Sequence, residues 1–221
     1  MLLPRSKSLR IHPVAIVFAL MFLPLLCFAG KEFIKPTPQA AKTYPAHDEH
    51  PLEKTTAALD PYDTPDKAKI FSVHYDEIGF LPVYLVITND GDEPVSLSEM
   101  KAQFVTGDRT KISPATEDDV YRRLSKPSPR TTRYPLPIPV GKVKGAVGKQ
   151  ALEEIQNSQF RAKAVEPHST QAGFLFFDVS ESSTPLAGAH FYLTGVHDAK
   201  GNELMYFEIS LDKSLSAPEK P

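Results

Sequence analysis

Apolar and polar residues alternate along several short segments of the chain, which is the pattern of β-strands with one buried face. Phe71, Val73 and Tyr75 alternate with polar residues, and in LPVYLVIT (81–88) every second residue falls on one apolar face. The run GFLFFDV (173–179) is apolar on both faces, which predicts a central strand. The pattern predicts strands at 71–75, 81–88, 95–97, 100–104, 160–165, 171–179, 189–196 and 203–211.

Turns and short helices separate these strands. The segments 89–92 and 198–202 contain residues that tolerate a positive φ angle, so each predicts a tight reversal. Thr116 and Asp119 have the spacing of a capping box, which predicts a short helix through Arg123. No strand alternates with a long helix. The pattern therefore predicts a mostly all-β fold, an antiparallel β-sandwich of seven to eight strands with one or two short helices.

The first 29 residues have the three-part layout of a secretory signal peptide. Three basic residues precede an uncharged apolar run over 14–29, and small residues precede a cleavage point before Gly30. The apolar run is about 16 residues long, whereas a bilayer-spanning helix needs about 20, so cleavage is favoured over an uncleaved anchor. A lipoprotein modified at Cys27 is a third alternative. All three predict an exported protein, periplasmic or extracellular.

After this segment we expect a linker, one domain and a tail. Cys27 is the only cysteine, so a chain cleaved before Gly30 has no disulfide and depends on its hydrophobic core. Six prolines and the lack of periodicity predict a disordered, proline-rich linker over 30–66. The folded domain is expected over 67–213 and a disordered tail over 214–221.

Two stretches, LPVYLVITNDGDEPVSL (81–97) and VEPHSTQAGFLFFDV (165–179), resemble the immunoglobulin-like β-sandwich domains of exported bacterial proteins of unknown function. In such domains a strand ends in an asparagine-glycine turn before a Pro-Val strand, and a Val-x-Pro segment leads into a Gly-Phe-Leu-Phe-Phe strand. The resemblance extends over 67–213, with 125–159 as an insertion that ends in a short helix over 151–159. The matching positions serve packing and turns, so the resemblance implies no catalytic residue. These positions are Val165, Pro167, Gly173 and Phe174.

The charge of the chain is unevenly distributed. Lys and Arg number 25 and Asp and Glu 27, and the first 29 residues hold three basic residues and no acid. The rest of the chain is therefore acidic, which argues against a nucleic-acid-binding protein. Within it, 122–149 carries eight basic residues and no acid, a loop that either attracts an anionic partner or is solvated and balances an acidic body. The candidate binding residues are Arg122, Arg123, Lys126, Arg130, Arg133, Tyr134, Lys142, Lys144 and Lys149.

The sequence contains no recognisable catalytic or cofactor motif, so we expect no cofactor and no metal. The densest set of metal-ligating residue types, at 47–50, lies in the predicted linker, where nothing rigid would organise it. His74, His168, His190 and His197 lie on or beside predicted strands. If His168 and His190 met nearby acids in one pocket, they could form an envelope hydrolase or a metal-dependent enzyme.

We therefore expect an exported, non-enzymatic, immunoglobulin-like module that binds a protein or an anionic envelope component. Membrane association is expected only through the N-terminal segment. The alternatives are the enzyme built on a β-sandwich and a sandwich that holds an apolar ligand between its sheets, which would require an internal cavity.

Overall fold

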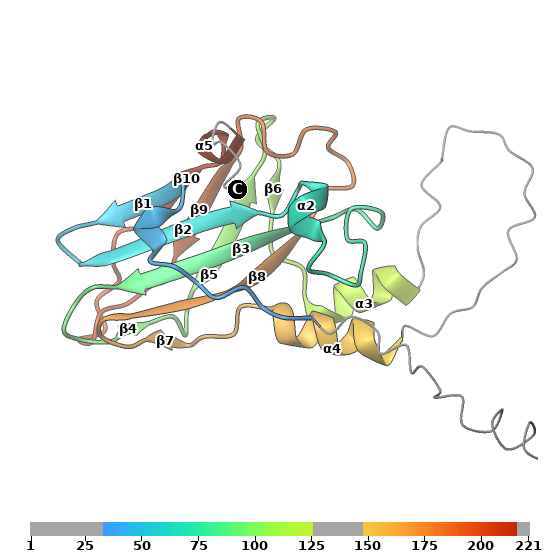
Figure 1. Ribbon diagram of the computed structural model, residues 1–221. Helices are drawn as coiled ribbons and strands as arrows, with labels where there is room; N and C mark the ends of the chain where they lie inside the picture. Colours follow the sequence, from blue (N-terminus) through green and yellow to red (C-terminus); the bar gives the residue numbers. More distant parts are fainter. Residues whose placement is uncertain (1–32, 126–147, 216–221) are drawn as a thin grey trace, which may run out of the picture. The chain divides into compact units, whose positions relative to one another are not determined.

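The computed structural model describes residues 33–125 and 148–215, which form ten β-strands in antiparallel sheets (Figure 1). The first sheet has the order β1-β2-β3-β8, with β1 at Ala46–His50, β2 at Thr55–Pro61, β3 at Phe80–Asn89 and β8 at Ser169–Asp178. The second sheet has the order β10-β9-β5-β6, with β10 at Phe207–Ser210, β9 at His190–Thr194, β5 at Lys101–Val105 and β6 at Lys111–Ile112. A separate pair joins β4 (Val95–Ser96) to β7 (Ala164–Val165).

Short helices lie between the strands and at both ends of the strand order along the chain. They are the 3-10 helix η1 (Ala41–Thr43) and the α-helices α2 (Pro65–Ala68), α3 (Glu117–Ser125), α4 (Lys149–Ser158) and α5 (Asp212–Leu215). The prediction of a mostly β fold with antiparallel sheets is confirmed. The helices expected after Thr116 and over 151–159 are present as α3 and α4.

The two sheets face each other through one apolar core. Alternate residues of β3 point toward the second sheet, and their counterparts there are the inward residues of β9 and β10. This alternation is the one read from the sequence of 81–88. The core contains Leu81, Val83, Leu85, Ile87, Phe104, Phe177, Phe191, Leu193, Phe207 and Ile209, all buried.

The first sheet is also covered on its opposite face. There Tyr84 of β3 and Phe174 and Phe176 of β8 pack against Val120 of α3, Ile155 of α4 and irregular segments of the chain. The run GFLFFDV is apolar on both faces for this reason. The prediction that it forms a central strand is wrong, since β8 lies at the end of the sheet order.

Backbone hydrogen bonds from neighbouring segments cover part of the outer edge of β8. The Phe160 N–H donates to the Phe174 carbonyl at 2.9 Å, and the Ala115 N–H donates to the Phe176 carbonyl at 2.7 Å. A Cβ on Gly173 would lie 2.5 Å from the Phe160 Cα, so only glycine allows the 159–160 segment this close to β8.

The prediction of a disordered linker over 30–66 is wrong for its described part, 33–66. This part forms η1, β1, β2 and the start of α2, and β2 is an inner strand in which Ala57 pairs with Ile87. The prolines mislead because they stand at strand boundaries: Pro61 is the last residue of β2, and Pro51 follows β1 in the turn to β2. These two strands also bring the total above the seven to eight expected.

Phe71, Val73 and Tyr75 do not form the predicted strand. The alternation separates buried from exposed residues correctly, because these three are buried while Ser72 and His74 are exposed. The segment is nevertheless irregular and has no strand partner. The segments expected at 160–165 and 203–211 contain only the shorter strands β7 and β10.

The predicted signal peptide or anchor, including Cys27, lies outside the described residues, as does 216–221 of the predicted tail. Among the helices of 33–125 and 148–215, none has the length and hydropathy needed to cross a membrane.

Candidate functional site

A large hollow of the described fold lies at one end of the first sheet. Because the strands are antiparallel, the end of β2, the start of β3 and the end of β8 meet at the same edge, where Phe80 pairs with Asp178. The connections 62–79 and 179–189 both leave from this edge. Between them is a pocket of about 880 Å³, here called the apolar pocket.

The walls of the apolar pocket are mainly apolar, and its rim is polar. The buried wall residues include Phe71, Val73, Phe80, Leu81 and Leu186. The rim contributes hydroxyl groups from Ser182, Ser183 and Thr184 and charged groups from Asp63, Lys69 and Asp76. Pockets for small molecules combine apolar walls with a few polar groups in this way.

A buried carboxylate holds one wall of the pocket. Glu154 of α4 is only 1% exposed. Its carboxylate accepts hydrogen bonds from the Ser72 N–H at 2.5 Å, from the Ser72 hydroxyl and from the Val73 N–H at 3.2 Å. A carboxylate that accepts backbone N–H bonds in a buried site makes charge-assisted hydrogen bonds, which are stronger than neutral ones. Helix α4 therefore fixes an irregular segment that has no strand partner.

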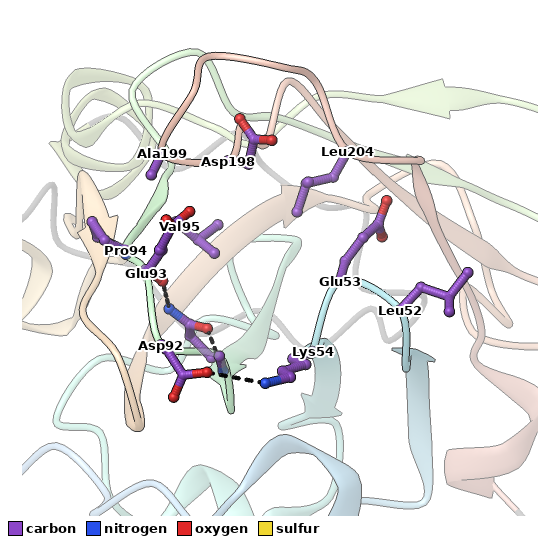
Figure 2. Close-up of a pocket in the computed structure, with 12 residues that line it drawn as sticks. Leu52, Glu53, Lys54, Asp92, Glu93, Pro94, Val95, Asp198, Ala199 and Leu204 are labelled. Atoms are coloured by element: carbon purple, nitrogen blue, oxygen red, sulfur yellow. Dashed lines mark hydrogen bonds and ion pairs between the residues drawn. The ribbon is translucent and has the colours of Figure 1, made fainter.

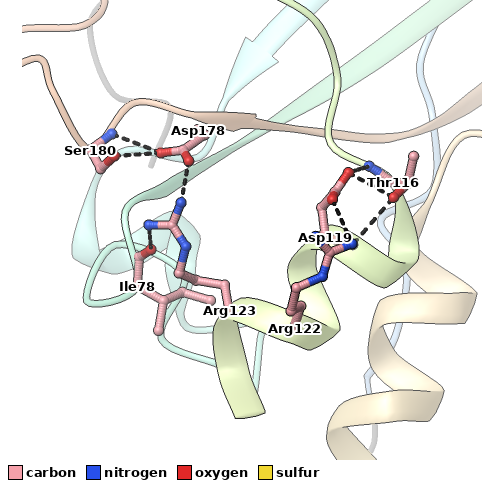
Figure 3. Close-up of polar contacts among 7 residues, drawn as sticks. All are labelled: Ile78, Thr116, Asp119, Arg122, Arg123, Asp178 and Ser180. Carbon is pink, nitrogen blue, oxygen red and sulfur yellow. Dashed lines mark hydrogen bonds and ion pairs between the residues drawn. The ribbon is translucent and has the colours of Figure 1, made fainter. Parts of the chain in front are cut away.

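An arginine of α3 holds the next part of the same wall (Figure 3). Arg123 pairs with the Asp178 carboxylate, donates to the Ile78 carbonyl at 3.4 Å and lies 5.5 Å from the centre of the Phe80 ring. Burial alone would raise the pKa of Asp178, but hydrogen bonds from Ser180 and the charge of Arg123 bring it below its ordinary value. The ion pair thus joins α3 to the edge where β3 begins and β8 ends.

Figure 3 also shows the cap that starts α3. The Asp119 N–H donates to the Thr116 hydroxyl at 3.2 Å, and the Asp119 carboxylate accepts from the Thr116 N–H at 3.1 Å. The predicted capping box is confirmed, with Asp in place of the more usual Glu or Gln.

Two tyrosines lining the pocket keep their protons. Burial, followed by the charge of Asp60, raises the pKa of Tyr62. Burial, followed by the charge of Glu154, raises the pKa of Tyr75. Both side chains are therefore neutral at physiological pH, as an apolar site requires.

A second hollow, of about 410 Å³, lies at the opposite end of the first sheet and is more polar (Figure 2). Its lining includes the acidic residues Glu53, Asp92, Glu93 and Asp198 and one cation, Lys54, which pairs with Asp92 at 3.1 Å. The buried amide of Asn89 donates to the Glu93 carbonyl at 2.8 Å and holds the turn there. The hollow has about half the volume of the apolar pocket and a more polar lining, so it is a weaker candidate for a site that binds an apolar ligand.

The structure describes three of the nine residues predicted to bind an anionic partner, and each of the three has an acidic partner within the chain. Arg122 pairs with Asp119 at 3.2 Å, Lys149 pairs with Glu153 at 3.3 Å, and Arg123 pairs with Asp178. The remaining six lie outside the described residues: Lys126, Arg130, Arg133, Tyr134, Lys142 and Lys144. The anion-binding loop remains a prediction.

Three of the histidines singled out in the sequence have separate acidic partners. His168 lies 3.2 Å from the Asp92 carboxylate, His190 lies 3.2 Å from that of Glu208, and His197 lies 3.9 Å from that of Glu99. His74 lines the apolar pocket. The geometry gives no shared site for His168 and His190. Within 33–125 and 148–215, no three His, Cys, Asp or Glu side chains are grouped so that they could hold a metal ion.

Sequence reasoning assigned the wall residues Phe71, Val73 and Tyr75 to a strand and missed Pro185 and Leu186. The signal that could have located the pocket is the long connection between the strands at 55–61 and 80–89, which is rich in aromatic residues. Long connections with buried side chains are often binding loops.

Comparisons with family models, with curated proteins and with solved structures found no match to this chain.

Proposed function

We propose that the chain is an exported, non-enzymatic binding module whose ligand site is the apolar pocket. The observation that carries this proposal is an 880 Å³ pocket with apolar walls and a polar rim. Pockets of this kind enclose ligands of small-molecule size. The expected ligand is therefore a largely apolar compound with a polar end that remains at the rim.

The clamps on the wall support this proposal. Ordering a mobile wall on binding would reduce affinity, whereas a wall fixed in advance avoids that loss. Glu154 and Arg123 fix the segment 71–80 from two different helices. The pocket is therefore largely preformed.

The immunoglobulin-like fold and the export of the protein belong to the same proposal. Two antiparallel sheets that share one core support a sandwich of this type, with β1 and β2 as additions to the expected strands. The partner first expected, a protein or an anionic envelope component, remains a prediction because it depends mainly on basic residues outside the described part of the chain.

Binding of the neutral apolar dye Nile red tests the ligand site. We expect one saturable site in the unmodified protein. Ala68→Trp places an indole at the pocket wall and should weaken binding by about tenfold or more. Ala199→Trp is the matched control, because Ala199 lines the polar hollow at the other end and should leave binding unchanged. Equal binding by both variants, or no saturable binding at all, would contradict the proposal.

A further inference from the structure

The outer face of the second sheet carries a row of three rings. In β9 the side chains of Phe191 and Leu193 point into the core, so His190 and Tyr192 point outward. Tyr206, directly before β10, is 51% exposed. Successive ring centroids lie 6.4 Å apart for His190 and Tyr192 and 6.2 Å apart for Tyr192 and Tyr206.

Polar groups lie between and beside these rings. Glu208 is directly opposite Tyr192 in the strand register, and its carboxylate accepts a hydrogen bond from the Tyr192 hydroxyl at 2.8 Å. Ser210 is opposite His190. The same surface continues into a shallow hollow of about 520 Å³ between β1 and β10, lined in part by Asp48, Tyr206 and Ser210.

The carboxylates of this surface lie beside imidazole rings. His50 lies between two carboxylates, 2.7 Å from that of Glu53 and 3.4 Å from that of Asp48. Glu208 has His190 beside it. Lys213 adds a positive charge to the lining of the hollow. A surface of this kind does not attract a polyanion such as nucleic acid, which requires an excess of basic groups.

Partly exposed rings, combined with hydrogen-bonding groups and no excess of basic groups, suit a ligand that is neutral and has both apolar and hydroxylated faces. Aromatic faces carry partial negative charge and attract C–H groups, while carboxylate and hydroxyl groups form hydrogen bonds with sugar hydroxyls. Clustered apolar groups on a protein surface are a mark of a binding site. We propose that the surface formed by His190, Tyr192, Tyr206, Glu208 and Ser210, the ring platform, binds a neutral carbohydrate chain.

Native gel electrophoresis through soluble polysaccharides tests this inference. The probes are hydroxyethylcellulose, glycol chitin, xylan and galactomannan, with dextran sulfate as a polyanion. The unmodified protein should be retarded by at least one of the four, and Tyr206→Ala and Tyr192→Ala should each weaken that retardation by about tenfold. Tyr121→Ala is the matched control, because Tyr121 is a 41% exposed tyrosine on α3 and should have no effect.

Tyr206→Phe keeps the ring and should retain binding, which separates loss of the ring from loss of the hydroxyl group. The thermal unfolding midpoint of each variant checks that the domain is intact. The inference is overturned if none of the four polysaccharides retards the protein or if only dextran sulfate does. It is also overturned if the two alanine variants are retarded as strongly as the Tyr121→Ala control.

Discussion

The two faces of the first sheet are covered by different kinds of structure. On one face the second sheet supplies a regular partner, and the side chains meet in one apolar core. On the other face, short helices and irregular segments cover an aromatic cluster that includes Phe71, Tyr84, Phe174 and Phe176. On the sheet-covered face the contact is an apolar core, with polar bonds such as Glu208 N–H to Asp48 at its border, whereas the helix-covered face depends on buried polar bonds such as those of Glu154. The apolar pocket is lined in part by the irregular segments of the helix-covered face, among them Phe71, Val73 and Tyr75.

The largest effect is expected from Phe177→Ala, which removes a fully buried ring from the sheet-covered face. Removal of a buried phenylalanine costs about 3–5 kcal/mol of unfolding free energy, because it loses apolar burial and leaves a cavity. Urea denaturation measures this loss. Because both sheets share this core, we expect hydrogen exchange to accelerate in the strands of both.

Phe174→Ala, on the same strand but the opposite face, sharpens the comparison. Phe174 contacts the rings of Phe71 at 5.0 Å and Tyr62 at 4.8 Å. We expect faster hydrogen exchange mainly in the covering segments 33–45 and 62–79. If the two variants gave the same exchange pattern, the two coverings would not differ as we propose.

A smaller effect is expected from Glu154→Ala, which removes a buried carboxylate from the helix-covered face. The Ser72 and Val73 N–H groups would lose their acceptor, which should cost about 3 kcal/mol in unfolding free energy and increase hydrogen exchange at these two amides. Glu153→Ala is the matched control, because Glu153 is an exposed neighbour on α4 whose loss should cost less than about 0.5 kcal/mol. Equal costs for both variants would show that the buried carboxylate does not hold the wall.

The difference between the two faces also explains which features could be predicted from the sequence. Alternation in 81–88 predicts β3 and its inward residues, because a strand with a regular partner has a regular side-chain period. The covering segments have no such period. For Phe71, Val73 and Tyr75 the alternation predicts burial correctly but backbone structure wrongly. The prolines around β1 and β2 predict a linker where the chain forms two strands.

The candidate site was less predictable than the fold. The apolar pocket depends on the meeting of 62–79 and 179–189, which are far apart in the sequence and are brought together only by the register of β3 with β8. The carboxylate of Glu154 accepts a hydrogen bond from Ser72, which is 82 positions away in the sequence. No local pattern in a single sequence encodes such a contact.

An effect of about 1 kcal/mol in unfolding free energy is expected from Tyr84→Phe. The Tyr84 hydroxyl donates to the Pro36 carbonyl at 2.6 Å and thereby holds the segment around Pro36 against the helix-covered face. The variant should be cleaved faster near 33–40 by a nonspecific protease under native conditions. Tyr121→Phe, at an exposed position on α3, should match the unmodified protein in both measurements.

The smallest effect is expected from the partly exposed pair of Arg123 and Asp178, whose side chains are 26% and 36% exposed. Water screens such a pair, so its contribution to unfolding free energy should stay below about 1 kcal/mol. The pKa of Asp178 is lower in the folded chain than its ordinary value of 3.8. The folded state therefore gains from ionised Asp178 above that pH, and the gain is lost as the pH falls through the lowered pKa.

A double-mutant cycle with Arg123→Met and Asp178→Asn isolates this contribution. The coupling free energy, measured by urea denaturation, should be present at neutral pH and should disappear in acid as Asp178 becomes protonated. Other carboxylates titrate in the same range, but the cycle removes their effect because they are common to all four proteins. A coupling that did not change with pH would mean that it does not arise from the charge of Asp178. A coupling near zero, with Arg123→Met still destabilising, would mean that Arg123 holds the wall through the Ile78 carbonyl and the Phe80 ring.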